Sequence, residues 1–108
     1  MNIIGIIRQE ILNNPVIIFM KGSPKQPKCN FSGNAASALM STTQPFAHVD
    51  ISQSFEIQQA LPKVSDWPTF PQIFIDGELI GGSDIIVELN EKGELKPMME
   101  AAINKAAV

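Results

Sequence analysis

Hydrophobic residues recur with a helical period at the start of the chain and then gather in a short run. Ile3, Ile7 and Ile11 follow one another at four-residue steps, which predicts an amphipathic helix over about residues 2–13. The apolar run over residues 16–20 combines β-branched and aromatic side chains and is typical of a buried strand. The chain is therefore expected to begin with a helix followed by a strand.

Helical spacing returns after an irregular segment that contains prolines. It predicts helices over about residues 30–41 and 53–61, with Pro62 closing the second of them. Residues 46–51, between these helices, are expected to form a second strand. A strand, a helix and another strand in succession imply a right-handed crossover between parallel strands.

The strongest turn signal lies in the carboxyl-terminal half. Asp76-Gly77 separates apolar runs at residues 72–75 and 78–80, which predicts an antiparallel hairpin. Residues 85–89 and 96–108 are expected to form one or two closing helices, with a break near Lys92-Gly93. Strands alternating with helices place the chain in the α/β class.

Composition narrows the chemistry that the chain can carry. Its 108 residues contain no repeats or linkers, so a single domain over residues 1–108 is expected. Cys29 is the only cysteine and His48 the only histidine, which excludes an intramolecular disulfide and a structural zinc site supplied by this chain alone. No secretory signal pattern and no apolar stretch of membrane-spanning length is evident, so a cytoplasmic protein is expected.

Charge is unevenly distributed along the chain. The net charge of −3 argues against nucleic acid as the main partner. Residues 1–49 nevertheless carry four basic side chains against one acidic side chain, a balance of +3, whereas residues 50–108 carry four against ten, a balance of −6. The basic half contains Cys29 and suits an anionic ligand. A solvated surface with unevenly placed lysines is the alternative.

Cys29 stands where a helix is expected to begin. The positive end of the helix dipole, together with Lys21, Lys25 and Lys28, favours the thiolate and lowers the pKa of the thiol. A small buried hydrophobe is the alternative, since most free cysteines behave in that way. The polar and proline neighbours of Cys29 favour an exposed, reactive thiol.

Two further segments offer contacts to a ligand. Gly81-Gly82 leads into another helix, with Ser83-Asp84 at the expected N-cap, and this N-terminus suits an anion or is a plain turn and cap. The rigid turn before it has an aromatic residue ahead of both Pro68 and Pro71, and a cis bond before Pro71 is compatible with it. His48 is a candidate acid or base by residue type, but a packed histidine in an apolar strand is the favoured interpretation.

Together these motifs resemble those of the monothiol glutaredoxins, over nearly all 108 residues. The matching segments are Met20-Lys21-Gly22-Ser23-Pro24, Cys29 followed by Phe31-Ser32, Trp67-Pro68-Thr69-Phe70-Pro71-Gln72, Asp76-Gly77-Glu78, and Gly81-Gly82 before Asp84. The resemblance implies a thioredoxin-like α/β fold, with a four-stranded mixed sheet and helices on both faces.

The resemblance also implies that glutathione binds beside Cys29. Lys21 would contact the glycine carboxylate of glutathione, and Gly82, Ser83 and Asp84 would contact its γ-glutamyl end. The backbone of Phe70, ahead of a cis Pro71, would pair with the cysteine residue of glutathione, and Thr69 would line the site. Phe31 would lie beside the sulfurs or the cluster. The Cys29 thiolate and a glutathione thiolate would ligate a 2Fe-2S cluster shared by a homodimer. BolA-like proteins and iron–sulfur acceptor proteins are the implied partners.

Three positions depart from the family pattern. Asn30 replaces a glycine beside the thiol, where its side chain either crowds a cluster or points outward as the first helical residue. Gln58 stands where an arginine often assists glutathione binding, which leaves Lys21 and Lys63 to hold the carboxylate. Ser83 replaces a second cysteine, so no disulfide can form within one chain.

Three functions remain open at this point. The first is an iron–sulfur cluster carrier or assembly protein. The second is a glutathione-dependent thiol oxidoreductase in which Cys29 attacks a mixed disulfide. It ranks lower because the long approach from Lys21 to Lys28 resembles the version that accompanies weak activity in this family. The third is a binding module that has lost both tasks, as Asn30 and Gln58 would signal.

Overall fold

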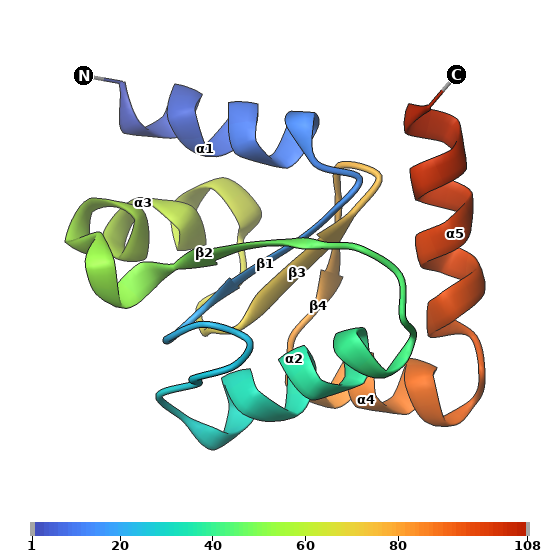
Figure 1. The fold of residues 1–108 in the computed structure, drawn as a ribbon. Helices are drawn as coiled ribbons and strands as arrows, with labels where there is room; N and C mark the ends of the chain where they lie inside the picture. The colour runs from blue at the N-terminus through green and yellow to red at the C-terminus, as the bar shows by residue number, and fades with distance from the viewer. Residues whose placement is uncertain (1, 108) are drawn as a thin grey trace.

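The structure is a computed structural model that describes residues 2–107 (Figure 1). Its elements in chain order are α1 (Ile3–Asn13), β1 (Val16–Met20), α2 (Asn30–Ser41), β2 (Ala47–Asp50), the 3-10 helix η1 (Ile51–Gln53), α3 (Phe55–Ser65), β3 (Gln72–Ile75), β4 (Glu78–Gly81), α4 (Ser83–Glu91) and α5 (Leu95–Ala106). The predicted order of helices and strands is confirmed.

The four strands form one mixed sheet in the order β2-β1-β3-β4. β1 pairs with β2 in parallel, so the predicted crossover through α2 is confirmed. β3 runs antiparallel to both β1 and β4, and the hairpin turns at Asp76 and Gly77. Both turn residues have positive φ, 54° and 79°, which is the conformation that a two-residue hairpin turn requires.

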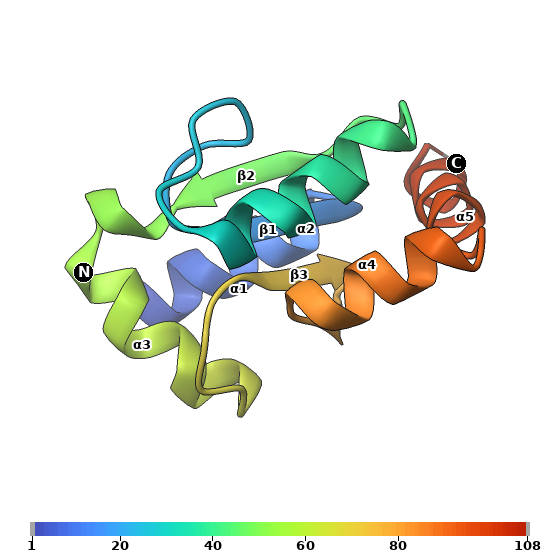
Figure 2. The same cartoon turned by 90° about the horizontal axis from the view of Figure 1, so that it is seen from below.

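Helices cover both faces of the sheet. α1 and α3 lie on one face, whereas α2, α4 and α5 pack on the other, with α2 and α4 crossing the sheet next to each other (Figures 1 and 2). The alternation of side chains along β1 divides its apolar run between the two faces. Ile18 belongs to the core under α2, and Phe19 belongs to the core under α1 and α3. The Phe19 ring packs edge to face on the Phe74 ring, with 5.7 Å between the ring centroids.

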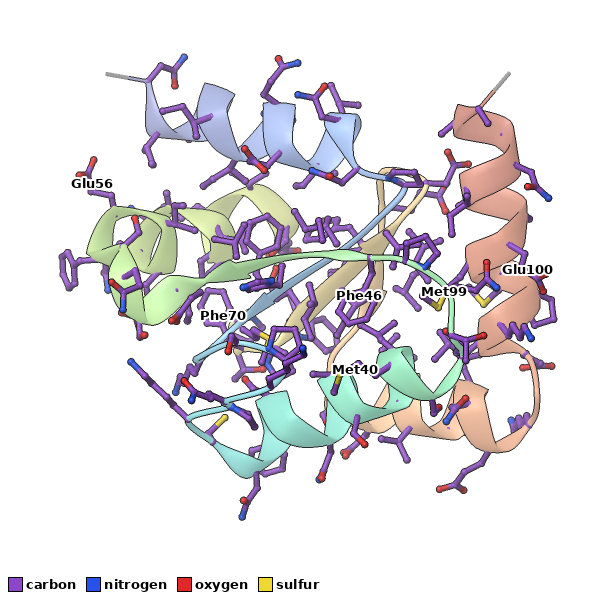
Figure 3. All side chains as sticks on the ribbon, in the orientation of Figure 1. Met40, Phe46, Glu56, Phe70, Met99 and Glu100 are labelled. Carbon is purple, nitrogen blue, oxygen red and sulfur yellow. The ribbon has the colours of Figure 1, made fainter. Side chains whose placement is uncertain are left out.

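α5 completes the core with buried apolar side chains. Met99 points from α5 toward the sheet, whereas Glu100 lies on the outer side of the same helix (Figure 3). Phe46 packs against this core just before β2. No helix within residues 2–107 combines the length and the hydropathy that a membrane crossing requires.

Several predicted boundaries are wrong. Pro62 lies inside α3, which continues to Ser65 instead of ending at the proline. The Ser65 hydroxyl donates to the carbonyl of Leu61 at 3.1 Å, and the helix ends at Asp66 in the left-handed conformation. The strand expected to reach residue 51 ends at Asp50, and η1 follows it.

The last two helices differ less from expectation. α4 begins at Ser83, two residues earlier than predicted, and α5 begins at Leu95. The break between them includes Gly93, as predicted. Val108, the last residue of the predicted closing helix, lies outside the described residues.

Candidate functional site

Cys29 is the N-cap of α2 and is partly exposed, so it is not a core residue. Its Sγ accepts a hydrogen bond from the backbone N–H of Ser32 at 3.4 Å. Burial is the largest single influence on the pKa of the thiol and raises it. Hydrogen bonds from the Ser32 side chain and backbone, the charge of Lys21 and the Phe31 amide oppose that effect and bring the pKa below its usual value. The direction of this pKa shift is the one expected for a thiol at the start of a helix.

The three lysines near Cys29 do not act alike. Lys21 is the lysine whose charge favours the thiolate. Lys28 instead donates from Nζ to the Ser52 hydroxyl at 3.1 Å, and its charge lowers the pKa of Asp50. Lys25 is exposed on the loop. The expectation that all three would favour ionisation of the thiol holds for Lys21 and is wrong for Lys25 and Lys28, whose charges do not contribute to the lowered pKa.

The segment from Lys21 to Lys28 is a closed loop, not an irregular excursion. The Lys28 N–H donates to the Lys21 carbonyl at 2.9 Å, and Ser23 and Gln26 exchange backbone hydrogen bonds at its tip. Gly22 has a φ of +90°, and a Cβ there would lie 2.7 Å from the Lys28 nitrogen and still closer to the Gln26 carbonyl oxygen. The loop therefore requires glycine at this position.

A groove of about 1000 Å³ opens beside this loop. The ten residues that the resemblance assigns to glutathione binding, including the weaker candidates Gln58 and Lys63, all line this groove. They are Lys21, Phe31, Gln58, Lys63, Thr69, Phe70, Pro71, Gly82, Ser83 and Asp84. Cys29 does not itself line the groove but stands two residues before Phe31, whose side chain is 62% exposed. The thiol is thus linked to the groove through Phe31 and through Lys21, a lining residue whose charge acts on it.

The far wall of the groove is the turn between α3 and β3. The Phe70-Pro71 peptide bond is cis, as the proline-rich turn allowed, and Phe70 lies beside the sheet (Figure 3). Gln72 is fully buried, and its Nε2 donates to the carbonyls of Trp67 at 2.9 Å and Thr69 at 3.2 Å. These two hydrogen bonds from the buried Gln72 amide stabilise the turn that forms this wall of the groove.

The N-terminus of α4 closes the groove on a third side. The N-cap is Gly82 and not Ser83-Asp84 as predicted, and no side chain caps the helix. Ser83 is buried as the first helical residue. The backbone N–H groups of this first turn consequently lack a side-chain acceptor, and together with the helix dipole they suit an anionic group in the groove.

Ser32 and Asp50 were missed as site residues in the sequence. Ser32 is fully buried, and its Oγ accepts from the Lys21 N–H at 3.0 Å while its side chain also hydrogen-bonds Cys29. Its position three residues after the N-cap is the signal that could have identified it. Asp50 accepts from the Gly22 N–H at 2.9 Å. No local pattern marks Asp50, because its partner lies 28 residues earlier.

His48 is exposed on β2, the edge strand, and does not line the groove, so the expectation of a packed histidine is wrong. Residues 2–107 contain no group of three or more histidine, cysteine or acidic side chains that could hold a metal ion. Any metal bound at Cys29 must take most of its ligands from outside the chain.

Comparison with known proteins decides the family. The family model described as Glutaredoxin matches residues 16–80, which include the loop, Cys29, the cis proline and the hairpin. The chain belongs to the glutaredoxin family. Its one cysteine makes it a monothiol member. Glutaredoxin 4 of Escherichia coli strain K12 is 46% identical to it over 99 residues, which cover 92% of this chain and 86% of that protein.

Other relatives and solved structures agree with this glutaredoxin assignment. Glutaredoxin 4 of Buchnera aphidicola subsp. Baizongia pistaciae is 52% identical over 95 residues, 88% of each chain. The solution structure of reduced poplar apo GrxS14 matches this glutaredoxin with a TM-score of 0.79 at 39% identity. The match covers 94% of this chain and 93% of the poplar chain. A buckwheat glutaredoxin–glutathione complex has a TM-score of 0.79 at 25% identity, covering 91% and 87%. The predicted thioredoxin-like fold is confirmed.

Proposed function

We propose that this monothiol glutaredoxin binds glutathione in the groove and, as a homodimer, carries a 2Fe-2S cluster in the cytoplasm for delivery to acceptor proteins. The observation that carries the proposal is the placement of the only cysteine. Cys29 is partly exposed, has a lowered pKa, and stands two residues before Phe31, which lines a groove large enough for a tripeptide. A BolA-like protein is the proposed regulatory or assembly partner.

Charge and backbone groups in the groove match the ends of glutathione. The glycine carboxylate would lie between Lys21 and Lys63, with Gln58 offering a neutral amide. The γ-glutamyl carboxylate would meet the uncapped N-terminus of α4 at Gly82 and Ser83, and its ammonium group would meet Asp84.

The middle of the tripeptide would lie along the remaining wall. Thr69 and Phe70, ahead of the cis Pro71, line the groove. Their backbone would hydrogen-bond the central cysteine residue of glutathione. This placement directs the glutathione sulfur toward Cys29, with Phe31 beside both sulfurs.

The number of ligands favours a shared cluster. A 2Fe-2S cluster requires four ligands, and one chain offers a single thiolate. Two chains and two glutathione molecules supply four thiolates. Asn30 does not oppose this arrangement, because it is the first residue of α2 and its side chain is exposed. The cluster is cargo in this scheme, and the chain supplies its thiolate and the glutathione site.

The lowered pKa of Cys29 also favours a second activity, the removal of glutathione from mixed disulfides. The Cys29 thiolate would attack the glutathione sulfur of the mixed disulfide, forming a Cys29–glutathione disulfide and releasing the target thiolate. A second glutathione thiolate would then attack that disulfide, releasing glutathione disulfide and restoring the Cys29 thiolate. One cysteine suffices for both steps.

Anaerobic reconstitution tests the proposal. Incubation with iron, sulfide and glutathione should give a coloured dimer, and omission of glutathione or the Cys29→Ser substitution should give a colourless monomer. A colourless monomer in the complete mixture contradicts cluster carriage. Turnover of a glutathionylated peptide that requires Cys29, in the absence of cluster formation, would make the oxidoreductase the principal function.

A further inference from the structure

Asp50 lies outside the groove but is hydrogen-bonded to the loop that precedes Cys29. It is the last residue of β2 and pairs in register with Met20, the residue at which the loop leaves β1. Its Oδ1 accepts three hydrogen bonds, from the Gly22 N–H at 2.9 Å, the Ser52 N–H at 2.9 Å and the Ser52 hydroxyl at 2.6 Å. One carboxylate oxygen thus binds the first part of the loop to the end of β2.

The second end of the loop reaches the same carboxylate through Ser52. The Lys28 Nζ donates to the Ser52 Oγ at 3.1 Å, and the Ser52 hydroxyl donates to Asp50. Cys29 follows Lys28 directly, so this tether acts on the backbone next to the thiol. Figure 2 shows the loop, in cyan, projecting beside β2.

The carboxylate of Asp50 determines which group donates in each hydrogen bond from Lys28 through Ser52. Because the Ser52 hydroxyl gives its only proton to the carboxylate, its oxygen is free to accept from Lys28. The relay therefore runs from ammonium to hydroxyl to carboxylate, and each hydrogen bond is strengthened by the charge at one end. Lys28 is in this way held toward β2, and Lys21 is left as the cation that acts on the thiolate.

We propose that Asp50 is a positioning residue for Cys29: by holding both ends of the loop from Lys21 to Lys28, it keeps the sulfur within hydrogen-bonding reach of Ser32 at the start of α2. The inference rests on Cys29 being the functional thiol, as proposed above. It concerns the reactivity of the thiol itself and requires neither glutathione nor a cluster.

The rate of Cys29 alkylation by iodoacetamide, followed across a pH series in the full chain, measures this role. Asp50→Ala should slow alkylation at neutral pH by roughly two- to tenfold, the range that one hydrogen bond supplies, and should move the rate–pH curve to higher pH. Asp50→Asn keeps an amide oxygen for both N–H donors and should stay within about twofold of the wild type. Glu100→Ala removes an exposed acid on the outer side of α5 and should match the wild type (Figure 3).

Each other outcome overturns the proposal. An Asp50→Ala curve that superimposes on the wild-type curve leaves Asp50 with a structural role only. Equal slowing in Asp50→Ala and Asp50→Asn contradicts the role of the acceptor oxygen, because Asp50→Asn keeps an oxygen for both N–H donors. If Asp50→Ala does not fold, Ser52→Ala carries the test, because it removes the Lys28 tether and the hydroxyl bond to Asp50 but keeps the Gly22 bond to Asp50. An unchanged curve in that variant refutes the claim that Asp50 holds both ends of the loop. Failed cluster reconstitution in the wild type would overturn the proposed function but leave this measurement readable.

Discussion

Gly22→Ala should distort the loop that leads to Cys29 and destabilise the fold at the same time. Alanine at a φ of +90° carries a conformational cost of about 1–2 kcal/mol. Its Cβ would in addition lie 2.7 Å from the Lys28 nitrogen and closer to the Gln26 carbonyl oxygen, both of them backbone atoms that cannot turn aside. Overpacking of this kind costs about 1–3 kcal/mol.

Gly77→Ala is the matched control for Gly22→Ala. Gly77 also has a positive φ, +79°, but a Cβ there would meet nothing within 4 Å. This variant should show only the conformational cost, about 1–2 kcal/mol. The difference between the two variants therefore isolates crowding in the loop, and it should appear as a melting temperature lower by about 4 °C or more for Gly22→Ala.

Two measurements follow the two effects of Gly22→Ala. Thermal or urea unfolding gives the stability of both variants, and alkylation of Cys29 below the unfolding transition reports on the thiol. We expect slower alkylation in Gly22→Ala and wild-type alkylation in Gly77→Ala. Equal destabilisation of the two variants together with unchanged Cys29 reactivity would refute both the crowding and the link from the loop to the thiol.

Ser32→Ala should raise the pKa of the Cys29 thiol, because it removes the side-chain hydrogen bond that favours the thiolate; the alkylation rate should fall at neutral pH and recover at high pH, and an unshifted rate–pH curve would contradict this. Lys21→Ala should weaken glutathione binding by roughly 10- to 100-fold in a calorimetric titration, the effect of one charge-assisted hydrogen bond, whereas the exposed Lys25→Ala should not. Gln58→Arg should strengthen glutathione binding by up to about tenfold in the same titration by restoring a cation to the groove, and an unchanged affinity would place the carboxylate elsewhere.

Local signals predicted much of this fold. The apolar run of β1 is buried on both faces, and Asp76-Gly77 adopts the positive φ angles that its sequence implies. The prediction that α3 ends at Pro62 is wrong. A proline lacks a backbone N–H and disfavours the helical conformation of the residue before it. In α3, the burial of Leu61 and the hydrogen bond from the Ser65 hydroxyl to the Leu61 carbonyl nevertheless stabilise one more turn. Boundaries set by tertiary packing cannot be read from the neighbouring residues alone.

The candidate site divides in the same way. Cys29 could be placed at a helix start because its neighbours carry the signal, and the motifs that resemble the family identified the segments that line the groove. Asp50 could not be found, since its role arises only when parallel pairing sets it opposite Met20. The commitment of Lys28 to Ser52 was hidden for the same reason: sequence proximity to the thiol does not determine where a long side chain points.

The two substitutions that called the function into question have different consequences in the folded chain. Asn30 begins α2 with its side chain exposed, and it neither packs into the core nor lines the groove. Gln58 lines the groove from α3, the helix that also carries Lys63, and a missing cation there weakens attraction for a carboxylate. Because only the second change acts on the ligand, a reduced affinity for glutathione is the expected departure from the relatives, while ligation by Cys29 is expected to persist at saturating glutathione.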